Sequence, residues 1–164
     1  MKRAAWLLVI AVLPTLVGCG YTAGGPFRND IKTIYVEIAS SHEFRRDIEF
    51  QLTEALEKRI NRDTPYTLAP RNRADTVLTT EIVEVRQAAW APDPYSRLPR
   101  EKELTLIVRV QWKDQRNGEM LIDVPVEAQS ADYLPPAGET DKYTLERVAD
   151  LMAGKIVRGM YNKW

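Results

Sequence analysis

The sequence predicts an α+β domain, a two-layer sandwich in which two helices pack on a mixed four-stranded sheet, in the order β-α-β-β-β-α. In residues 104–112 every second side chain is apolar, and those between are polar except Ile107, which is the period of a half-buried strand. Two further segments, one on each side of this strand-rich centre, repeat apolar residues every three to four positions. That is the period of an amphipathic helix, so each segment should bury one face on the sheet.

The first strand and the first helix follow from the residues before Pro65. Residues 31–38 alternate and are rich in β-branched and aromatic side chains, which predicts a strand. Ser40 and Glu43 have the spacing of a capping box, so a helix should begin near Ser40 or Ser41 and end before Pro65. Mixed charges between its apolar residues favour packing on a sheet over a position on a membrane surface. The apolar stripe is Phe44, Ile48, Leu52, Leu56 and Ile60.

The remaining strands and the second helix occupy residues 75–161. A long strand is predicted over 75–86, and its alternation changes parity near Ile82, which indicates a β-bulge. After the strand at 104–113, Asn117-Gly118 predicts a hairpin turn. The returning strand of this hairpin, residues 120–128, contains Pro125 and is therefore an edge strand or locally broken. One face of this arm is predicted as Met120, Ile122, Val124, Val126 and Ala128. The second helix should span about 141–161, with the stripe Leu145, Val148, Ala149, Met152, Ile156 and Met160.

The N-terminus predicts export and lipid attachment. A short basic start precedes an apolar run, residues 4–17, which is interrupted by Pro14 and too short to span a bilayer comfortably. The run ends Leu-Val-Gly-Cys at residues 16–19, which resembles the lipobox of bacterial lipoproteins. The resemblance implies cleavage before Cys19 and acylation of that cysteine. The alternative is a plain secretory signal with a coincidental cysteine.

The chain therefore divides into a signal peptide, residues 1–18, a lipidated flexible tether, residues 19–30, and a folded domain, residues 31–164. Gly20, and not an aspartate, follows the cysteine. By resemblance to enterobacterial sorting, this favours the outer membrane, with the protein lipid-anchored on the periplasmic side.

The composition argues against several classes of function. The 23 basic residues balance the 23 acidic ones, so no electrostatic attraction to nucleic acid is indicated. His42 is the only histidine and lies at the predicted helix start, outside any triad or metal-ligand pattern. Glu81 and Glu84 should face opposite sides of one strand and so cannot act on one bond. The sequence predicts no enzyme, no cofactor and no metal.

Two long loops are predicted, residues 88–102 and 129–140, and both combine prolines with aromatic residues. Long loops in a compact domain are often functional, and the alternative is a mobile hairpin tip and a helix lead-in. Trp90, Tyr95 and Tyr133 are therefore the candidate contacts for a partner.

Several stretches, in order, resemble the LptE-type lipopolysaccharide-assembly lipoprotein family. These stretches are residues 19–21, 31–36, 49–56, 62–66 and 74–78, together with the C-terminal helix and the final Trp164. The chain departs from the family pattern at 37–42, where the family has a proline and an asparagine after the first strand. The resemblance implies a domain that inserts as a plug into the outer-membrane lipopolysaccharide translocon barrel and binds lipopolysaccharide.

Lipopolysaccharide phosphates require cations, and arginine can bond them with two nitrogens. Arg109 and Lys113 lie four residues apart on one strand, on the face opposite the core, hence roughly 13 Å apart. Arg86 joins them if its strand is the neighbour. The alternative for this face is an ordinary solvated strand surface. The alternative function is a structural or pilot lipoprotein that chaperones another barrel or a secretin, and a cell-wall enzyme is disfavoured by the missing chemistry.

Overall fold

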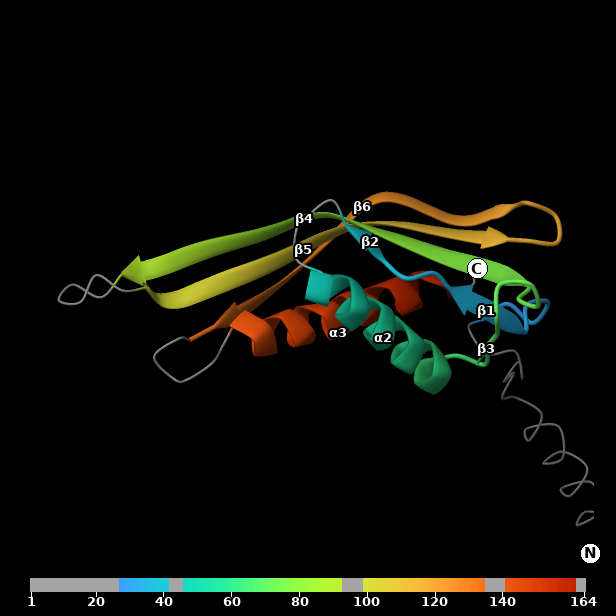
Figure 1. Ribbon diagram of the computed structural model, residues 1–164, viewed down its shortest axis with the longest axis horizontal. Helices are drawn as coiled ribbons and strands as arrows, with labels where there is room; N and C mark the ends of the chain where they lie inside the picture. Colours follow the sequence, from blue (N-terminus) through green and yellow to red (C-terminus); the bar gives the residue numbers. More distant parts are fainter. Residues whose placement is uncertain (1–26, 42–45, 93–98, 135–140, 162–164) are drawn as a thin grey trace, which may run out of the picture.

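The computed structural model describes residues 27–41, 46–92, 99–134 and 141–161 and shows two layers, a twisted sheet with two helices on one of its faces (Figure 1). The predicted α+β class is confirmed. The elements are β1 (Thr33–Val36), β2 (Ser40–Ser41), α2 (Arg46–Asp63), β3 (Thr67–Leu68), β4 (Thr76–Pro92), β5 (Pro99–Asp114), β6 (Met120–Tyr133) and α3 (Asp141–Gly159).

The sheet is mixed, as predicted, and its order is β3-β1-β4-β5-β6, with β2 also paired to β4. β1 runs parallel to β3 and β4, whereas β4, β5 and β6 form an antiparallel meander. Within the described residues the sheet has six strands and not four. The two additional strands, β2 and β3, have two residues each, which is too short for periodicity to reveal them.

The predicted start of the first helix is wrong. Ser40 and Ser41 pair in parallel with Glu81 and Ile82 as strand β2, and the described part of α2 begins at Arg46. The backbone N–H of buried Ala39 donates to Thr53 Oγ1 at 2.9 Å, which ties this segment to the helix. The free edge of β4 provides backbone hydrogen-bond partners for this segment. These bonds stabilise a strand here in place of the helix start that the local capping pattern predicted. His42, Glu43 and Phe44 lie outside the described residues.

The central strands are longer than predicted. The predicted bulge is confirmed, because the β4–β5 register shifts between Ile82 and Glu84. β4 continues to Pro92, β5 begins at Pro99 and β6 continues to Tyr133, so most of the predicted loop 88–102 and the start of the loop 129–140 are strand. Pairing with a neighbouring strand satisfies the backbone groups there, and aromatic and proline content alone does not reveal such pairing. We call this projecting part, residues 84–92 and 99–107, the hairpin arm (Figure 1).

The core lies between the two layers, as the apolar stripes predicted. Both helices bury their stripes against the inner face of the sheet, and α2 also bonds α3 through Arg59 and Asp150, at 2.9 and 2.6 Å. β6 is an edge strand, which is one of the two alternatives that Pro125 left open. The buried residues of this core include Ile48, Leu52, Leu56, Leu104, Leu106, Val108, Val110, Val148, Met152 and Ile156.

The folded body includes the last residues of the predicted tether. Phe27 is buried and packs edge-on against Tyr66 and Tyr161, with ring centroids 5.7 and 4.8 Å apart. Arg28 and Arg116 both bond Asp30, at 2.9 and 3.3 Å, and hydrogen bonding to Arg28 is the main cause that lowers the pKa of Asp30 to about 2. We call this part of the molecule, formed by residues 28–32, 71–75 and 113–119, the proximal end.

Candidate functional site on the outer face of the sheet

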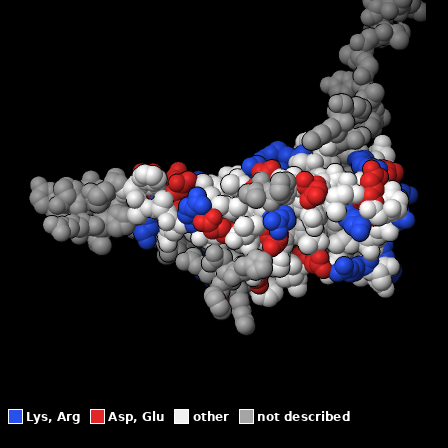
Figure 2. All heavy atoms as spheres, turned by 90° about the horizontal axis from the view of Figure 1, so that it is seen from above, with Lys and Arg blue, Asp and Glu red and all other residues white. Residues whose placement is uncertain are grey.

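The face of the sheet opposite the helices is the candidate site. Both helices lie on one side of the sheet, so among the described elements this outer face carries no second layer (Figure 1). The strand register places Thr79 and Glu81 of β4 beside Gln111 and Arg109 of β5 on it. Viewed from this side, basic and acidic atoms are interspersed among uncharged ones (Figure 2). The outer face is therefore polar and is built from long, regular strands.

The three predicted cations lie on this face. Arg109 and Lys113 are both exposed on β5, four residues and hence roughly 13 Å apart. β4 is the neighbour of β5, and Arg86 is paired with Thr105. Arg86 therefore lies on the side of Arg109 that is away from Lys113. The structure thus brings the three side chains to one face as an extended row and not as a cluster.

Two of these cations already have a carboxylate partner. Arg109 bonds Glu81 at 2.6 Å and Arg86 bonds Glu84 at 2.9 Å, both at the surface. Among the described residues, Lys113 has no ion pair. Exposed pairs of this kind are worth about 0–1 kcal/mol, so an anion that presents two oxygens can displace the carboxylate.

The bulge corrects the prediction for the two glutamates. Because Val83 is an extra residue between the register pairs, Glu84 faces the same side as Glu81 and not the opposite side. Each carboxylate is bonded to its own arginine. Within the described part of the chain no group of three or more His, Cys, Asp or Glu side chains could hold a metal ion.

A shallow depression of about 320 Å³ lies beside Lys113 on the outer face. Arg71 reaches it from the turn before β4 and bonds Glu37 at 2.7 Å, and the second oxygen of Glu37 accepts from Thr79 at 2.9 Å. Basic and apolar groups therefore meet at one place. The lining is Arg71, Val77, Thr79, Gln111, Lys113, Gln115, Gly118 and Met120.

Sequence reasoning missed Arg71 and Met120 at this site. Met120 was predicted on one face with Ile122, but the β5–β6 register shifts beside Trp112, which turns Met120 outward to 44% exposure. A second shift, between Val108 and Val110, places Ala128 opposite outer-face Ile107. Local alternation does not report such shifts in an edge strand, and no sequence signal brings Arg71 to this position.

The aromatic candidates have different positions. Trp90 lies on β4 opposite Glu101 and is 56% exposed, so it is available to a partner. Tyr133 is buried on β6, accepts a hydrogen bond from Gln87 Nε2, and has Lys102 Nζ 5.7 Å from its ring centroid. Its predicted position in an exposed loop is therefore wrong. Tyr95 and Cys19 lie outside the described residues.

The fold and this face define a small two-layer α+β domain with one polar, partly basic surface. In the described ranges, no helix is long and apolar enough to cross a membrane. A family model described as "LptE: Lipopolysaccharide-assembly" matches residues 31–163. The chain belongs to the LptE family and is a lipopolysaccharide-assembly lipoprotein, a non-enzymatic class.

Solved structures share the fold at low sequence identity. The uncharacterized lipoprotein B from Nitrosomonas europaea aligns with a TM-score of 0.59 and 12% identity, over 87% of this chain and 89% of that one. A single-substitution variant of the PelC dodecamer from Paraburkholderia phytofirmans gives 0.54 and 15%, over 86% and 96%. A minor lipoprotein from Acinetobacter baumannii gives 0.50 and 20%, over 79% and 90%. A comparison with curated proteins found no match.

Proposed function

We propose that the protein is an outer-membrane lipoprotein, acylated at Cys19 and held on the periplasmic side, that plugs the lipopolysaccharide translocon barrel and supports lipopolysaccharide transport. Family membership over residues 31–163 and the lipobox-like residues 16–19 support this proposal. The observation that carries it is the outer face of the sheet. This face is long, polar and free of a second layer among the described elements.

A plug must present polar surface to a water-filled lumen and still hold its position. The outer face supplies exposed or half-exposed polar side chains, such as Thr79, Gln111 and Arg109, on regular strands. The hairpin arm adds Trp90, whose large ring is exposed and is of the type that dominates binding energy at interfaces. The outer face and the arm should therefore contact the barrel, whereas the helix layer should not.

The same face offers a site for lipopolysaccharide. Arg109, Lys113 and Arg86 present cations along adjacent strands, and the depression beside Lys113 adds Arg71 and the exposed apolar Met120. A phosphate-bearing acylated ligand needs cationic and apolar groups side by side, and this end of the face has both.

Photo-crosslinking tests the orientation of the plug. Crosslinking residues at Trp90, Gln111 and the predicted contact Tyr95 should capture a very large outer-membrane barrel protein. Matched exposed positions on the helix layer, Lys58 and Arg147, should capture it much less. Capture only from the helix positions would overturn the orientation. A pull-down from detergent-solubilised membranes identifies the partner, and recovery of a secretin instead would support the pilot-lipoprotein alternative.

Replacement of Cys19 by Ala tests the anchor. The variant should remain an uncleaved precursor and take up no labelled palmitate, because the acylated atom and the cleavage signal are both lost. Normal maturation with fatty acid attached would contradict the anchor assignment.

A further inference from the structure

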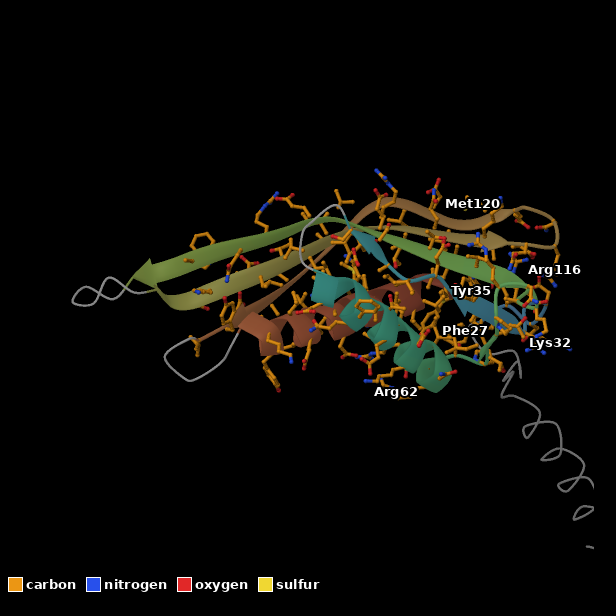
Figure 3. All side chains as sticks on the ribbon, viewed as in Figure 1. Phe27, Lys32, Tyr35, Arg62, Arg116 and Met120 are labelled. Carbon is orange, nitrogen blue, oxygen red and sulfur yellow. The ribbon has the colours of Figure 1, made fainter. Side chains whose placement is uncertain are left out.

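The proximal end lies where the chain enters the fold, and its position is restricted by the tether. Lys32 and Arg116 lie at the tip of this end, beyond Phe27 (Figure 3). If Cys19 carries the lipid, as proposed above, eight residue spacings separate it from Phe27. A chain of that length reaches at most about 29 Å when fully extended. Because Phe27 is buried in the aromatic cluster, the folded body cannot move further away without losing core contacts.

The carboxylates of the proximal end are mostly bonded within the fold. Asp75 accepts the backbone N–H groups of Lys32 and Thr33, both at 2.9 Å. Asp114 is buried and bonds Arg116 at 2.6 Å, and Arg116 also reaches Asp30. Glu119 is exposed beside the turn and accepts from Asn117 Nδ2 at 3.2 Å.

The cations of the same end point outward. Lys32, Arg73 and Lys113 are exposed, and no ion pair to another described residue holds any of their side chains. Tyr161, 41% exposed, lies against Phe27 at the point where the chain enters the fold. Exposed cations and amphipathic aromatic rings are the groups that bind the headgroup region of a bilayer.

We propose that the proximal end is a docking surface for anionic phospholipid headgroups of the leaflet that holds the lipid anchor. This proposal rests on the proposed acylation of Cys19. The tether keeps the surface close to the membrane at all times, so weak attraction is sufficient to orient the domain. Lys32 and Arg73 bind headgroup phosphates, and Tyr161 lies at the interface. The hairpin arm lies at the opposite end of the domain (Figure 1).

Energy transfer to labelled lipid tests this docking with the full acylated chain. Since acylation occupies Cys19, a cysteine introduced by Asn117→Cys at the proximal end, or Glu101→Cys on the arm, takes one dye. The protein is incorporated into phosphatidylcholine vesicles, with or without phosphatidylglycerol, that contain an acceptor lipid. Transfer should be stronger from position 117 than from 101 and should rise with phosphatidylglycerol. Lys32→Glu with Arg73→Glu should lower the signal from 117 by about half.

A matched double charge reversal on α3, Lys142→Glu with Arg147→Glu, should leave the signal unchanged. These exposed residues lie in the first half of the helix, which is far from the proximal end (Figure 1). Equal thermal midpoints confirm that both variants fold. An anchored chain whose proximal signal ignores both phosphatidylglycerol and the reversal at Lys32 and Arg73 would overturn the docking surface and leave the anchor intact. A chain that fails to float with vesicles of either composition would overturn both.

Discussion

The two faces of β5 have different roles, although they share one backbone. On the inner face Leu104, Leu106 and Val108 are fully buried under the helices. On the outer face Arg109 and Lys113 are exposed, and Arg109 bonds a carboxylate on the next strand. The stability of the fold therefore depends mainly on the inner face. The side chains of the outer face make few contacts within the fold and are available to bind partners. Substitutions at adjacent residues of this strand should therefore separate stability from binding.

The largest effect is expected from a deletion on the inner face. Leu106→Ala should lower the free energy of unfolding by about 2–5 kcal/mol, because it leaves a cavity between the sheet and the helices. Its neighbour Ile107 is only partly buried on the outer face, so Ile107→Ala is the matched control and should cost at most about 1 kcal/mol. Denaturant unfolding of both variants measures the difference. Equal losses would mean that the two faces do not differ as the structure indicates.

Sequence reasoning predicted the inner face well because burial repeats at local periods. The stripes of both helices and the alternation of residues 104–112 identified core residues without any knowledge of pairing. The bulge near Ile82 was also predictable, since the apolar residues change parity there. Each of these signals is contained within one element of the chain.

The outer face could be predicted only in part, because its geometry depends on register between elements. Arg109 and Lys113 followed from alternation alone, and Arg86 required that β4 be the neighbour of β5. The shared face of Glu81 and Glu84 and the exposure of Met120 both result from register shifts. Arg71 arrives from a turn far away in the sequence. A capping pattern predicted a helix start where the structure has strand β2. This strand depends on its pairing with β4, which is a tertiary contact that a local sequence pattern does not contain.

Asp114 differs from the other inner-face residues of β5. It has the inner-face parity of β5 and is only 1% exposed, yet it is a carboxylate that bonds Arg116. Asp114→Ala removes the partner of the Arg116 guanidinium and of its backbone N–H, so it should destabilise the fold by about 1–3 kcal/mol. Thermal unfolding of the variant measures this loss. A change within experimental error would place Asp114 functionally with the outer face.

The pH dependence sharpens the same point. Bonding to Arg116 lowers the pKa of Asp114, and bonding to Arg28 lowers that of Asp30 to about 2, both from an ordinary value of 3.8. A carboxylate with a lowered folded-state pKa stabilises the fold above its ordinary value, and this stabilisation is lost as the pH falls towards the folded-state value. The stability difference between wild type and Asp114→Ala should therefore be full at pH 5 and shrink as the pH falls below 3.8 towards the lowered pKa of Asp114. A difference that stays constant over this range would contradict the proposed ion pair.

The smallest expected effect on stability, with a clear effect on binding, comes from the outer face itself. Arg109→Glu with Lys113→Glu removes one exposed ion pair and places a second carboxylate opposite Glu81, so the free energy of unfolding should fall by about 1 kcal/mol or less. Lipopolysaccharide binding by the purified protein should fall at least tenfold, about 1.4 kcal/mol. Two cations become carboxylates, and one of them, Lys113, lines the depression. Lys142→Glu with Arg147→Glu applies the same change of charge to the helix layer and should leave binding in place. If both double variants weaken binding equally, net charge and not the outer face controls the interaction. If neither does, the lipopolysaccharide site lies elsewhere on the chain, and the row of cations is an ordinary solvated strand face.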